Sequence, residues 1–178
     1  MANALQPGWV KKMNKWYVIY SRTGSELDIA KVINRDMGVV GALVPRRELR
    51  ERKSGMLHKV YRTLFPGYVF INAELTTELY YRLLKVPGTI RLLGEPTPLY
   101  EYEMEHILAL TGCSGLVERS SLLLEGSHIT VSRGPLVGLE GQIKKLDKRK
   151  GRAKVELMLF NQPKIVELSI DVITKSEQ

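Results

Sequence analysis

The apolar pattern that follows the Pro-Gly turn signal at 66–67 predicts the central strand of this chain. The next four residues all have strand propensity. Because side chains alternate across a strand, Tyr68 and Phe70 share one face, while Val69 and Ile71 share the other. Flanking helices can cover the aliphatic face, which leaves the aromatic face available for a partner. The alternative is a central strand with a core on both faces.

Strand and helix patterns alternate through residues 15–112 in the order β-α-β-loop-β-α-β-α. This order is typical of an α+β, ferredoxin-like sandwich. The stretch 46–62 is basic and polar and nothing in it could build a core, so we expect an exposed loop or hairpin. Ser25 followed by Asp28 predicts a capping box. We expect strands at 15–20, 39–44, 68–71 and 89–93, and helices that begin near Ser25, Thr76 and Glu101 and end near Gly38, Pro87 and Gly112.

The last third of the chain has a different texture, with short strand-forming runs separated by turn signals. Apolar residues at every second position from Ala153 to Leu159 indicate a strand with one buried face. A region of about 50 residues with this pattern favours a small β-barrel. We expect its strands at 128–132, 142–146, 152–159 and 164–168.

These patterns divide the 178 residues into four segments. A chain of this length is enough for two small domains. We expect a flexible N-terminus at 1–14, a first domain at 15–112, a polar linker at 113–124 and a second domain at 125–178.

The net charge of +8 predicts a polyanionic partner, either nucleic acid or an acidic membrane surface. Two stretches carry the excess: 46–62 holds 7 basic and 2 acidic residues, and 144–154 holds 7 basic and 1 acidic residue. A solvated face is the plain alternative for either run. We see no membrane span and no secretory signal, and the single cysteine, Cys113, fits a reducing compartment. These features predict a cytoplasmic protein.

Enzymatic functions find little support in the sequence. The three histidines, His58, His106 and His128, are scattered and have no spacing suited to a metal. No glycine-rich phosphate loop follows a predicted strand. Cys113 lies in the expected linker without a nearby base to activate it. We therefore expect no catalytic residues, no metal and no cofactor.

Two groups of residues match the motifs of a known protein family. One is the run from Phe65 to Val69, Phe-Pro-Gly-Tyr-Val, followed by a helix and then Val-Pro-Gly at 86–88. The other resembles the KOW motif and consists of Gly126, Val131, Gly134-Pro135, Gly141-Gln142-Ile143 and Lys150-Gly151-Arg152. In this order the two groups resemble the NusG family of transcription elongation factors. The resemblance implies an N-terminal NusG-type (NGN) α/β sandwich, a linker and a C-terminal SH3-like β-barrel.

The family's N-terminal domain docks with its aromatic face on the clamp helices of the largest RNA polymerase subunit. Aromatic anchors of this kind are typical of interface hot spots. The alternative for some of them is a place in the core. Carried over to this chain, the resemblance predicts polymerase contacts from Trp16, Phe65, Pro66, Tyr68 and Tyr80.

The chain also departs from the family pattern. Leu136 replaces the phenylalanine expected after Gly-Pro, and Phe160-Asn-Gln-Pro replaces Phe-Gly-Arg. Both changes count against the usual contacts with a small ribosomal subunit protein or the Rho termination factor. Lys85-Val86 replaces the Asn-Thr pair of some pause-promoting members, which counts against base-specific reading of non-template DNA, although that DNA remains an implied partner.

The basic run at 144–154 is a feature that these replacements do not explain. Dense Lys and Arg side chains at a turn between two strands suit RNA, which proteins bind through its shape and phosphates. We expect RNA contacts from Lys144, Lys145, Lys148, Arg149, Lys150, Arg152 and Lys154.

With this run the chain resembles LoaP, the antiterminator subgroup whose KOW domain recognises an RNA hairpin in a leader transcript. The first hypothesis is therefore a processive antitermination factor that binds both polymerase and structured nascent RNA. The second is a general NusG-type elongation factor that couples polymerase to the ribosome or Rho. The third is a ribosome-associated KOW protein without a polymerase contact.

Overall fold

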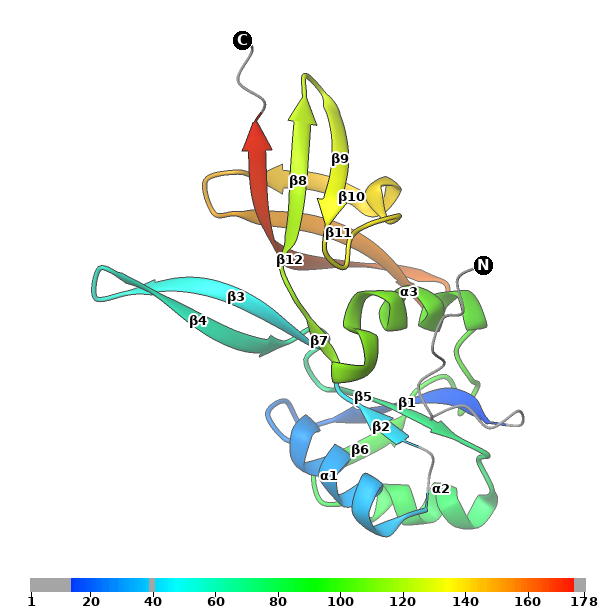
Figure 1. Ribbon diagram of the computed structural model, residues 1–178. Helices are drawn as coiled ribbons and strands as arrows, with labels where there is room; N and C mark the ends of the chain where they lie inside the picture. Colours follow the sequence, from blue (N-terminus) through cyan, green and yellow to red (C-terminus); the bar gives the residue numbers. More distant parts are fainter. Residues whose placement is uncertain (1–13, 39–40, 175–178) are drawn as a thin grey trace. The chain divides into compact units, whose positions relative to one another are not determined.

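The computed structural model describes residues 14–38 and 41–174. Apart from Asn14, the segment 1–14 that was expected to be flexible lies outside the described residues. No helix in the described part is long and apolar enough to cross a membrane. The chain divides into two compact units, Met1–Val44 with Phe65–Met104 and Pro45–Leu64 with Glu105–Gln178 (Figure 1).

The first unit is built on a four-stranded sheet in which every neighbouring pair of strands is antiparallel. In spatial order its strands are β2 (Gly41–Leu43), β5 (Tyr68–Ala73), β1 (Lys15–Ser21) and β6 (Thr89–Leu92). The strand expected after Pro-Gly is therefore the inner strand β5. The first two residues of the strand expected at 39–44 lie outside the described residues.

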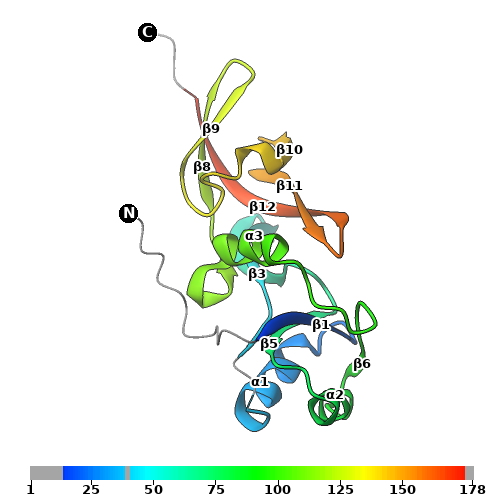
Figure 2. The ribbon, with the colours of Figure 1, turned by 90° about the vertical axis from the view of Figure 1, so that its right-hand side faces the viewer.

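Two helices, α1 (Glu26–Asp36) and α2 (Thr77–Leu84), lie on one face of this sheet (Figures 1 and 2). Val69 and Ile71 of β5 are fully buried and share one core with Leu83 of α2 and with isoleucines of α1. Each such side chain contributes about 1.5–3 kcal/mol when it leaves water. The prediction that helices cover the aliphatic face of β5 is confirmed.

The ends of these helices follow the sequence signals only in part. Thr76 caps α2, because its hydroxyl accepts a hydrogen bond from the Leu79 N–H at 3.1 Å. Gly38 has a φ of +61°, which suits the residue just after the end of α1. Ser25, in contrast, makes no side-chain hydrogen bond to the first turn of α1, so the predicted capping box is wrong.

In the second unit, the basic stretch at 46–62 forms a β-hairpin of β3 (Arg46–Lys53) and β4 (Met56–Thr63). Ser54 and Gly55 join the strands with φ angles of +52° and +81°, the left-handed pair that a tight hairpin turn requires. Leu49 is only 3% exposed, which corrects the expectation that nothing here is buried. A short strand, β7 (Leu116–Val117), pairs in parallel with the start of β3.

The rest of the second unit is the greater part of a helix that begins in the first unit, followed by a five-stranded sheet. The helix, α3 (Glu101–Thr111), ends before Gly112 as predicted. In spatial order the strands are β10 (Ile143–Asp147), β11 (Arg152–Leu159), β12 (Gln162–Thr174), β8 (Ser120–Glu125) and β9 (His128–Arg133). β8 begins inside the segment 113–124 that the sequence assigned to a linker.

β12 is much longer than the strand expected at 164–168 because it pairs with two neighbours in succession. Its first part, through Ser169, pairs antiparallel with β11, and its second part, from Ile170, pairs in parallel with β8. Ala153 and Leu159 of β11, and the apolar residues between them at every second position, are almost completely buried. The alternation predicted for β11 is confirmed.

Candidate polymerase-docking face and nucleic-acid interface

The face of the first sheet opposite the helices carries a cluster of aromatic rings. In the register of β1 and β5, Tyr20 lies directly across from Tyr68. Their ring centroids are 6.1 Å apart in an edge-on arrangement. Phe65 stacks on Tyr68 at 6.3 Å and contacts Phe70 at 5.7 Å. We call Tyr20, Phe65, Tyr68 and Phe70 the aromatic cluster.

Exposure within the aromatic cluster increases from one side to the other. Phe70 is completely buried and Phe65 is 6% exposed. Tyr68 is half-buried, and Tyr20 is 37% exposed. The two phenylalanines therefore support the two tyrosines, which present the accessible ring surface.

The turn before β5 is held by a buried carboxylate. Glu26 accepts hydrogen bonds from the Gly67 N–H at 2.6 Å and from the Gly24 N–H at 2.7 Å. The Gly67 carbonyl in turn accepts from the Ser21 N–H at 2.7 Å. Gly67 has a φ of +84°, and a Cβ there would lie 3.1 Å from both the Ser21 carbonyl oxygen and the Tyr20 ring. Glycine at this position lets the turn approach β1 beside the aromatic cluster.

Glu26→Ala should lower the free energy of unfolding by about 1–3 kcal/mol, because the buried Gly67 N–H loses its acceptor. Urea denaturation of the purified chain measures this loss. Glu26→Gln keeps one carbonyl oxygen and should lose less. The control is Glu78→Ala, which removes an acidic side chain from the first turn of the other helix. Equal losses for Glu26→Ala and Glu78→Ala would contradict a role of Glu26 in holding the turn.

The predicted polymerase contacts do not all lie together. Phe65 and Tyr68 belong to the aromatic cluster, and Pro66 is exposed beside them. Trp16 is half-buried on β1. An even number of positions separates it from Tyr20 along the strand, so the two side chains lie on the same face. Tyr80 packs against the core on the helix-covered face of the sheet. Tyr20 was missed by the sequence analysis, although its spacing from Trp16 is the signal that could have found it.

The second candidate interface is the hairpin of β10 and β11, which carries the seven predicted RNA contacts. Its turn is closed by Asp147, whose carboxylate accepts a hydrogen bond from the Lys150 N–H at 2.9 Å. Gly151 follows with a φ of +61°, and its carbonyl accepts from the Ile170 N–H of β12 at 2.9 Å. We call the cations from 144 to 154 the basic ridge: Lys144, Lys145, Lys148, Arg149, Lys150, Arg152 and Lys154.

A register shift concentrates charge on the ridge. Ile143 pairs with Val155, but Lys145 pairs with Lys154, so Lys144 is an extra residue on β10. A β-bulge of this kind changes which way side chains point. The Lys144 ammonium lies 3.3 Å from Glu156, which shares a strand face with Lys154. Two consecutive lysines therefore reach the same face of the hairpin.

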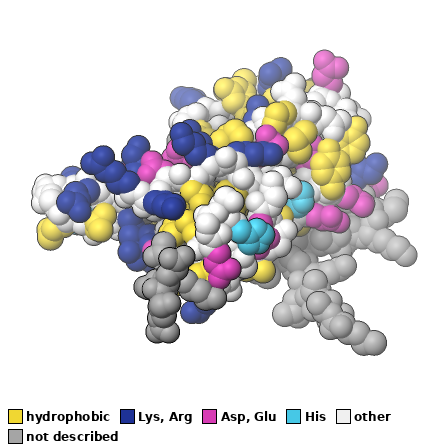
Figure 3. Space-filling view, turned by 90° about the horizontal axis from the view of Figure 1, so that it is seen from above, with side chains coloured by type: hydrophobic (Ala, Val, Ile, Leu, Met, Phe, Trp, Pro, Cys, Tyr) yellow, Lys and Arg dark blue, Asp and Glu magenta, His cyan; other side chains and the backbone are white. Residues whose placement is uncertain are grey.

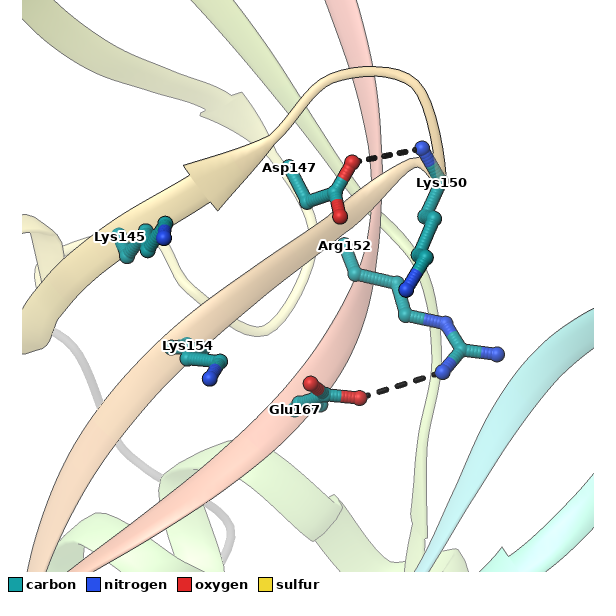
Figure 4. A pocket seen from close by; sticks show the side chains of 6 residues that line it. All are labelled: Lys145, Asp147, Lys150, Arg152, Lys154 and Glu167. Atoms are coloured by element: carbon teal, nitrogen blue, oxygen red, sulfur yellow. Dashed lines mark hydrogen bonds and ion pairs between the residues drawn. The ribbon is translucent and has the colours of Figure 1, made fainter.

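Acidic side chains from neighbouring strands enter the ridge, which the sequence analysis did not foresee. Arg152 donates to Glu167 of β12 at 3.1 Å, in addition to the pairing of Lys144 with Glu156. A pocket of about 140 Å³ lies between these strands. It is lined by Lys145, Asp147, Lys150, Arg152, Lys154 and Glu167 (Figure 4). Asp147 is therefore one of three acids on the ridge, and the expectation of a nearly unbalanced charge run is corrected.

Most of the ridge nevertheless stays available to an anion. Within residues 14–38 and 41–174, five of its cations have no ion pair and their side chains are exposed: Lys145, Lys148, Arg149, Lys150 and Lys154. Lys145 and Lys154 also lie directly across from each other, which disfavours strand pairing, and Glu167 lies across from Lys154 on its other side. The structure thus brings the predicted RNA contacts onto one hairpin and leaves most of them unneutralised.

Comparison with known proteins identifies the family. A family model described as "Transcription termination factor nusG" matches residues 14–108, which is more than half of the chain. The chain belongs to the NusG family. NusG family proteins act with RNA polymerase in transcription and are not enzymes.

Curated NusG proteins match this chain over nearly its whole length. The "Transcription termination/antitermination protein NusG" of Campylobacter jejuni is 28% identical over 172 residues, 91% of this chain and 97% of that protein. The protein of the same name from Rickettsia prowazekii is 28% identical over 182 residues, 96% of this chain and 95% of that protein. The chain is thus similar to complete NusG proteins.

A solved structure supports the same conclusion. The structure titled "Domain interaction in Thermotoga maritima NusG" superposes with a TM-score of 0.57 and 25% identity, and the match covers 88% of this chain and 93% of that one. The architecture is therefore the α+β NusG arrangement, with an NGN sandwich followed by a β-rich KOW domain of the SH3-like class.

The two family departures in the KOW half have different structural consequences. Leu136 is completely buried, and its N–H bonds to the Ser120 hydroxyl of β8 at 3.0 Å, so it is a core residue rather than an apolar tip. Val137, next in the chain, is 56% exposed instead. Phe160 is half-buried, and it and Asn161 form the β11–β12 turn with φ angles of +53° and +56°. Val137 and Phe160 are the apolar groups left at these two loops.

Proposed function

We propose that this NusG family protein is a processive antitermination factor of the LoaP kind. In this proposal the NGN domain, residues 15–112, docks on the clamp helices of the largest RNA polymerase subunit. The KOW domain, residues 125–178, binds a hairpin in the nascent leader RNA, and residues 113–124 connect the two. Both activities belong to the cytoplasm, where the transcript emerges.

The observation that carries the proposal is the basic ridge. Five exposed cations without an ion pair in the described part of the chain lie on one β-hairpin, and two of them face each other across the strands. Like charges in directly opposite positions disfavour strand pairing, and bound phosphates would relieve them. A-form RNA offers closely spaced phosphates and hides its bases in a deep major groove, so a dense group of cations suits it.

The aromatic cluster supports the polymerase half of the proposal. Two tyrosines present ring surface above two buried phenylalanines, which is the anchor-and-support arrangement of an interface hot spot. Pro66 and Trp16 extend this surface on the same side of the sheet, and Tyr20 joins the proposed contacts. Tyr80 contributes from α2 only if the docking surface also reaches that helix.

A general NusG role is the second candidate, because this chain is similar over nearly its whole length to proteins named for termination and antitermination. Such a factor would couple polymerase to the ribosome or Rho, and Val137 and Phe160 are the side chains available for that contact. The match to the NusG model over residues 14–108 counts against a ribosomal KOW protein that lacks a polymerase contact.

Crosslinking the protein to RNA in cells and sequencing the bound fragments tests the proposal. The antitermination role predicts enrichment of a hairpin upstream of a long operon, and loss of that enrichment in a ridge variant such as Lys148→Gln/Arg149→Gln. Crosslinks spread evenly over all transcripts, in both proteins, would favour the general role instead.

A further inference from the structure

The β3–β4 hairpin carries a second group of cations that the proposed function does not use. In its register Arg50 lies directly across from Lys59, and Arg47 lies across from Arg62. Like charges in directly opposite positions disfavour strand pairing. Seven basic residues and two acidic ones lie between 46 and 62, so this hairpin is nearly as cationic as the stretch 144–154, with seven and one. Lys and Arg side chains cover it, with hydrophobic groups exposed among them (Figure 3).

The alternation of side chains divides these residues between two faces. One face presents Arg50 and Arg52 from β3 with Leu57, Lys59 and Tyr61 from β4. We call these five residues the hairpin face. Leu57 is 60% exposed and Tyr61 is 49% exposed. The face therefore combines cations with an accessible aromatic ring and an accessible aliphatic side chain.

Little within the described residues neutralises the hairpin face. Glu48 holds Lys59 at 3.0 Å, and this hydrogen bond raises the pKa of Lys59. Arg50 and Arg52 are exposed and form no ion pair within residues 14–38 and 41–174. The second acid of the hairpin, Glu51, pairs with Arg62 on the other face at 3.0 Å.

The base of the hairpin is fixed to the same sheet that carries the basic ridge. Arg47 donates to the Glu167 carbonyl oxygen of β12, and burial lowers the pKa of its guanidinium. The Ser169 hydroxyl donates to the Glu48 carbonyl oxygen at 2.6 Å. The Glu167 carboxylate is also the partner of Arg152 on the ridge. One residue of β12 thus contacts both basic elements, so the base of the hairpin lies next to the ridge.

We propose that the hairpin face is a second RNA-binding site, which takes the single-stranded RNA that flanks the hairpin bound by the ridge. Arg50 and Arg52 bind phosphates, and Tyr61 stacks on a base. Cations interleaved with an accessible aromatic ring are the usual means of binding single strands. That the single strand flanks an RNA hairpin rests on the proposed function, whereas the binding of single-stranded RNA to the hairpin face does not.

The test uses the full chain and a labelled, unstructured RNA of twelve nucleotides, with fluorescence anisotropy at several salt concentrations. Arg50→Gln/Arg52→Gln should weaken binding and flatten the salt dependence by about 1.4 units, the value for two phosphate contacts on a single strand. Tyr61→Leu should weaken binding roughly tenfold with little change in the salt slope. The matched control, Arg22→Gln/Lys31→Gln, removes two exposed charges elsewhere and should bind normally.

The ridge variant Lys148→Gln/Arg149→Gln separates this inference from the proposed function. This variant should lose its binding to the RNA hairpin but keep most of its affinity for the unstructured RNA. If the wild-type chain does not prefer a hairpin, the proposed function fails, yet a loss in Arg50→Gln/Arg52→Gln still supports the second site.

Three results would overturn the second site. The first is that Arg50→Gln/Arg52→Gln binds the unstructured RNA with wild-type affinity and wild-type salt slope. The second is that the ridge variant no longer binds the unstructured RNA at all, which would place the single strand on the ridge. The third is tighter binding of a polyglutamate peptide of equal charge than of the RNA, which would indicate an acidic protein partner.

Discussion

Replacing Tyr68 by alanine should weaken binding of this chain to RNA polymerase by about 2 kcal/mol or more, roughly thirtyfold. Tyr68 is half-buried against Phe65 and Tyr20, so its ring is held in place while part of it stays accessible. A rigid ring that is already ordered loses little entropy when a partner covers it. Surface-immobilised polymerase and purified variants measure the change in Kd, and Tyr20→Ala should show a smaller loss in the same direction.

Phe65 needs a milder substitution than Tyr68. At 6% exposure it belongs to the packed part of the aromatic cluster, and Phe65→Ala would cost about 3–5 kcal/mol of stability. Phe65→Leu keeps most of the volume and removes the ring, so it tests docking in a chain that remains folded. Urea denaturation of each variant separates lost docking from lost folding.

The control for polymerase docking is Tyr81→Ala, an exposed tyrosine on the helix that covers the opposite face of the sheet. It should bind polymerase normally. If Tyr81→Ala and Tyr68→Ala lose equal affinity, or if a folded Tyr68→Ala binds like the wild type, polymerase does not dock on the aromatic cluster.

The predicted strands agree well with the structure wherever a strand keeps one neighbour from its first residue to its last. β11 was predicted with its observed limits because apolar residues at every second position mark a single buried face. β12 was predicted too short because it changes partner at Ile170, and pairing with a distant strand leaves no mark in local alternation. The capping prediction at Ser25 failed because Ser25 has φ −97° and ψ −3°, a helical backbone instead of the extended one that an N-cap residue usually has.

The candidate sites were predictable to the extent that they lie on one strand or one turn. The basic ridge is a continuous run of sequence, and the structure keeps it on one hairpin. Its acids were missed because Glu156 and Glu167 reach Lys144 and Arg152 only through the pairing of three strands. Tyr20 was missed because its place beside Tyr68 depends on the register of β1 with β5.

Three like-charge pairs lie directly across from each other in the described strands, and all of them are in the second unit. They are Arg47 with Arg62, Arg50 with Lys59, and Lys145 with Lys154. Like charges in such positions disfavour strand pairing. An acid partly offsets each pair: Glu51 beside Arg62, Glu48 beside Lys59, and Glu167 across from Lys154. A ligand that binds only the folded state raises the free energy of unfolding, and the increase grows with its concentration and its affinity. RNA should therefore raise the melting temperature of this chain.

Lys148→Gln/Arg149→Gln should reduce affinity for the RNA hairpin by roughly a hundredfold and flatten the salt slope by about two units, one for each lost phosphate contact. Both side chains lie at the exposed turn of the ridge and have no ion pair in the described part of the chain. Isotherms for the full chain at several salt concentrations measure both quantities. The full chain is needed because β8, which pairs with β12, begins at Ser120.

The control, Arg133→Gln/Lys164→Gln, removes the same charge from other strands of the same sheet and should leave the slope nearly unchanged. Equal slopes for the two double variants would indicate that net charge, rather than the ridge, binds the RNA. Polymerase binding should be unchanged in both, because the aromatic cluster belongs to the other unit.

Arg149 is the residue expected to read a base edge. The sequence left Arg149 and Arg152 as equal candidates, but the Arg152 guanidinium already donates to Glu167 at 3.1 Å. Arg149→Lys keeps the charge and loses the planar fork that bonds two acceptors at once. This variant should therefore keep the wild-type salt slope and bind cognate and scrambled hairpins with similar affinity. If it still discriminates between them while Arg152→Lys does not, the reading arginine is Arg152, and RNA binding must first open its pair with Glu167.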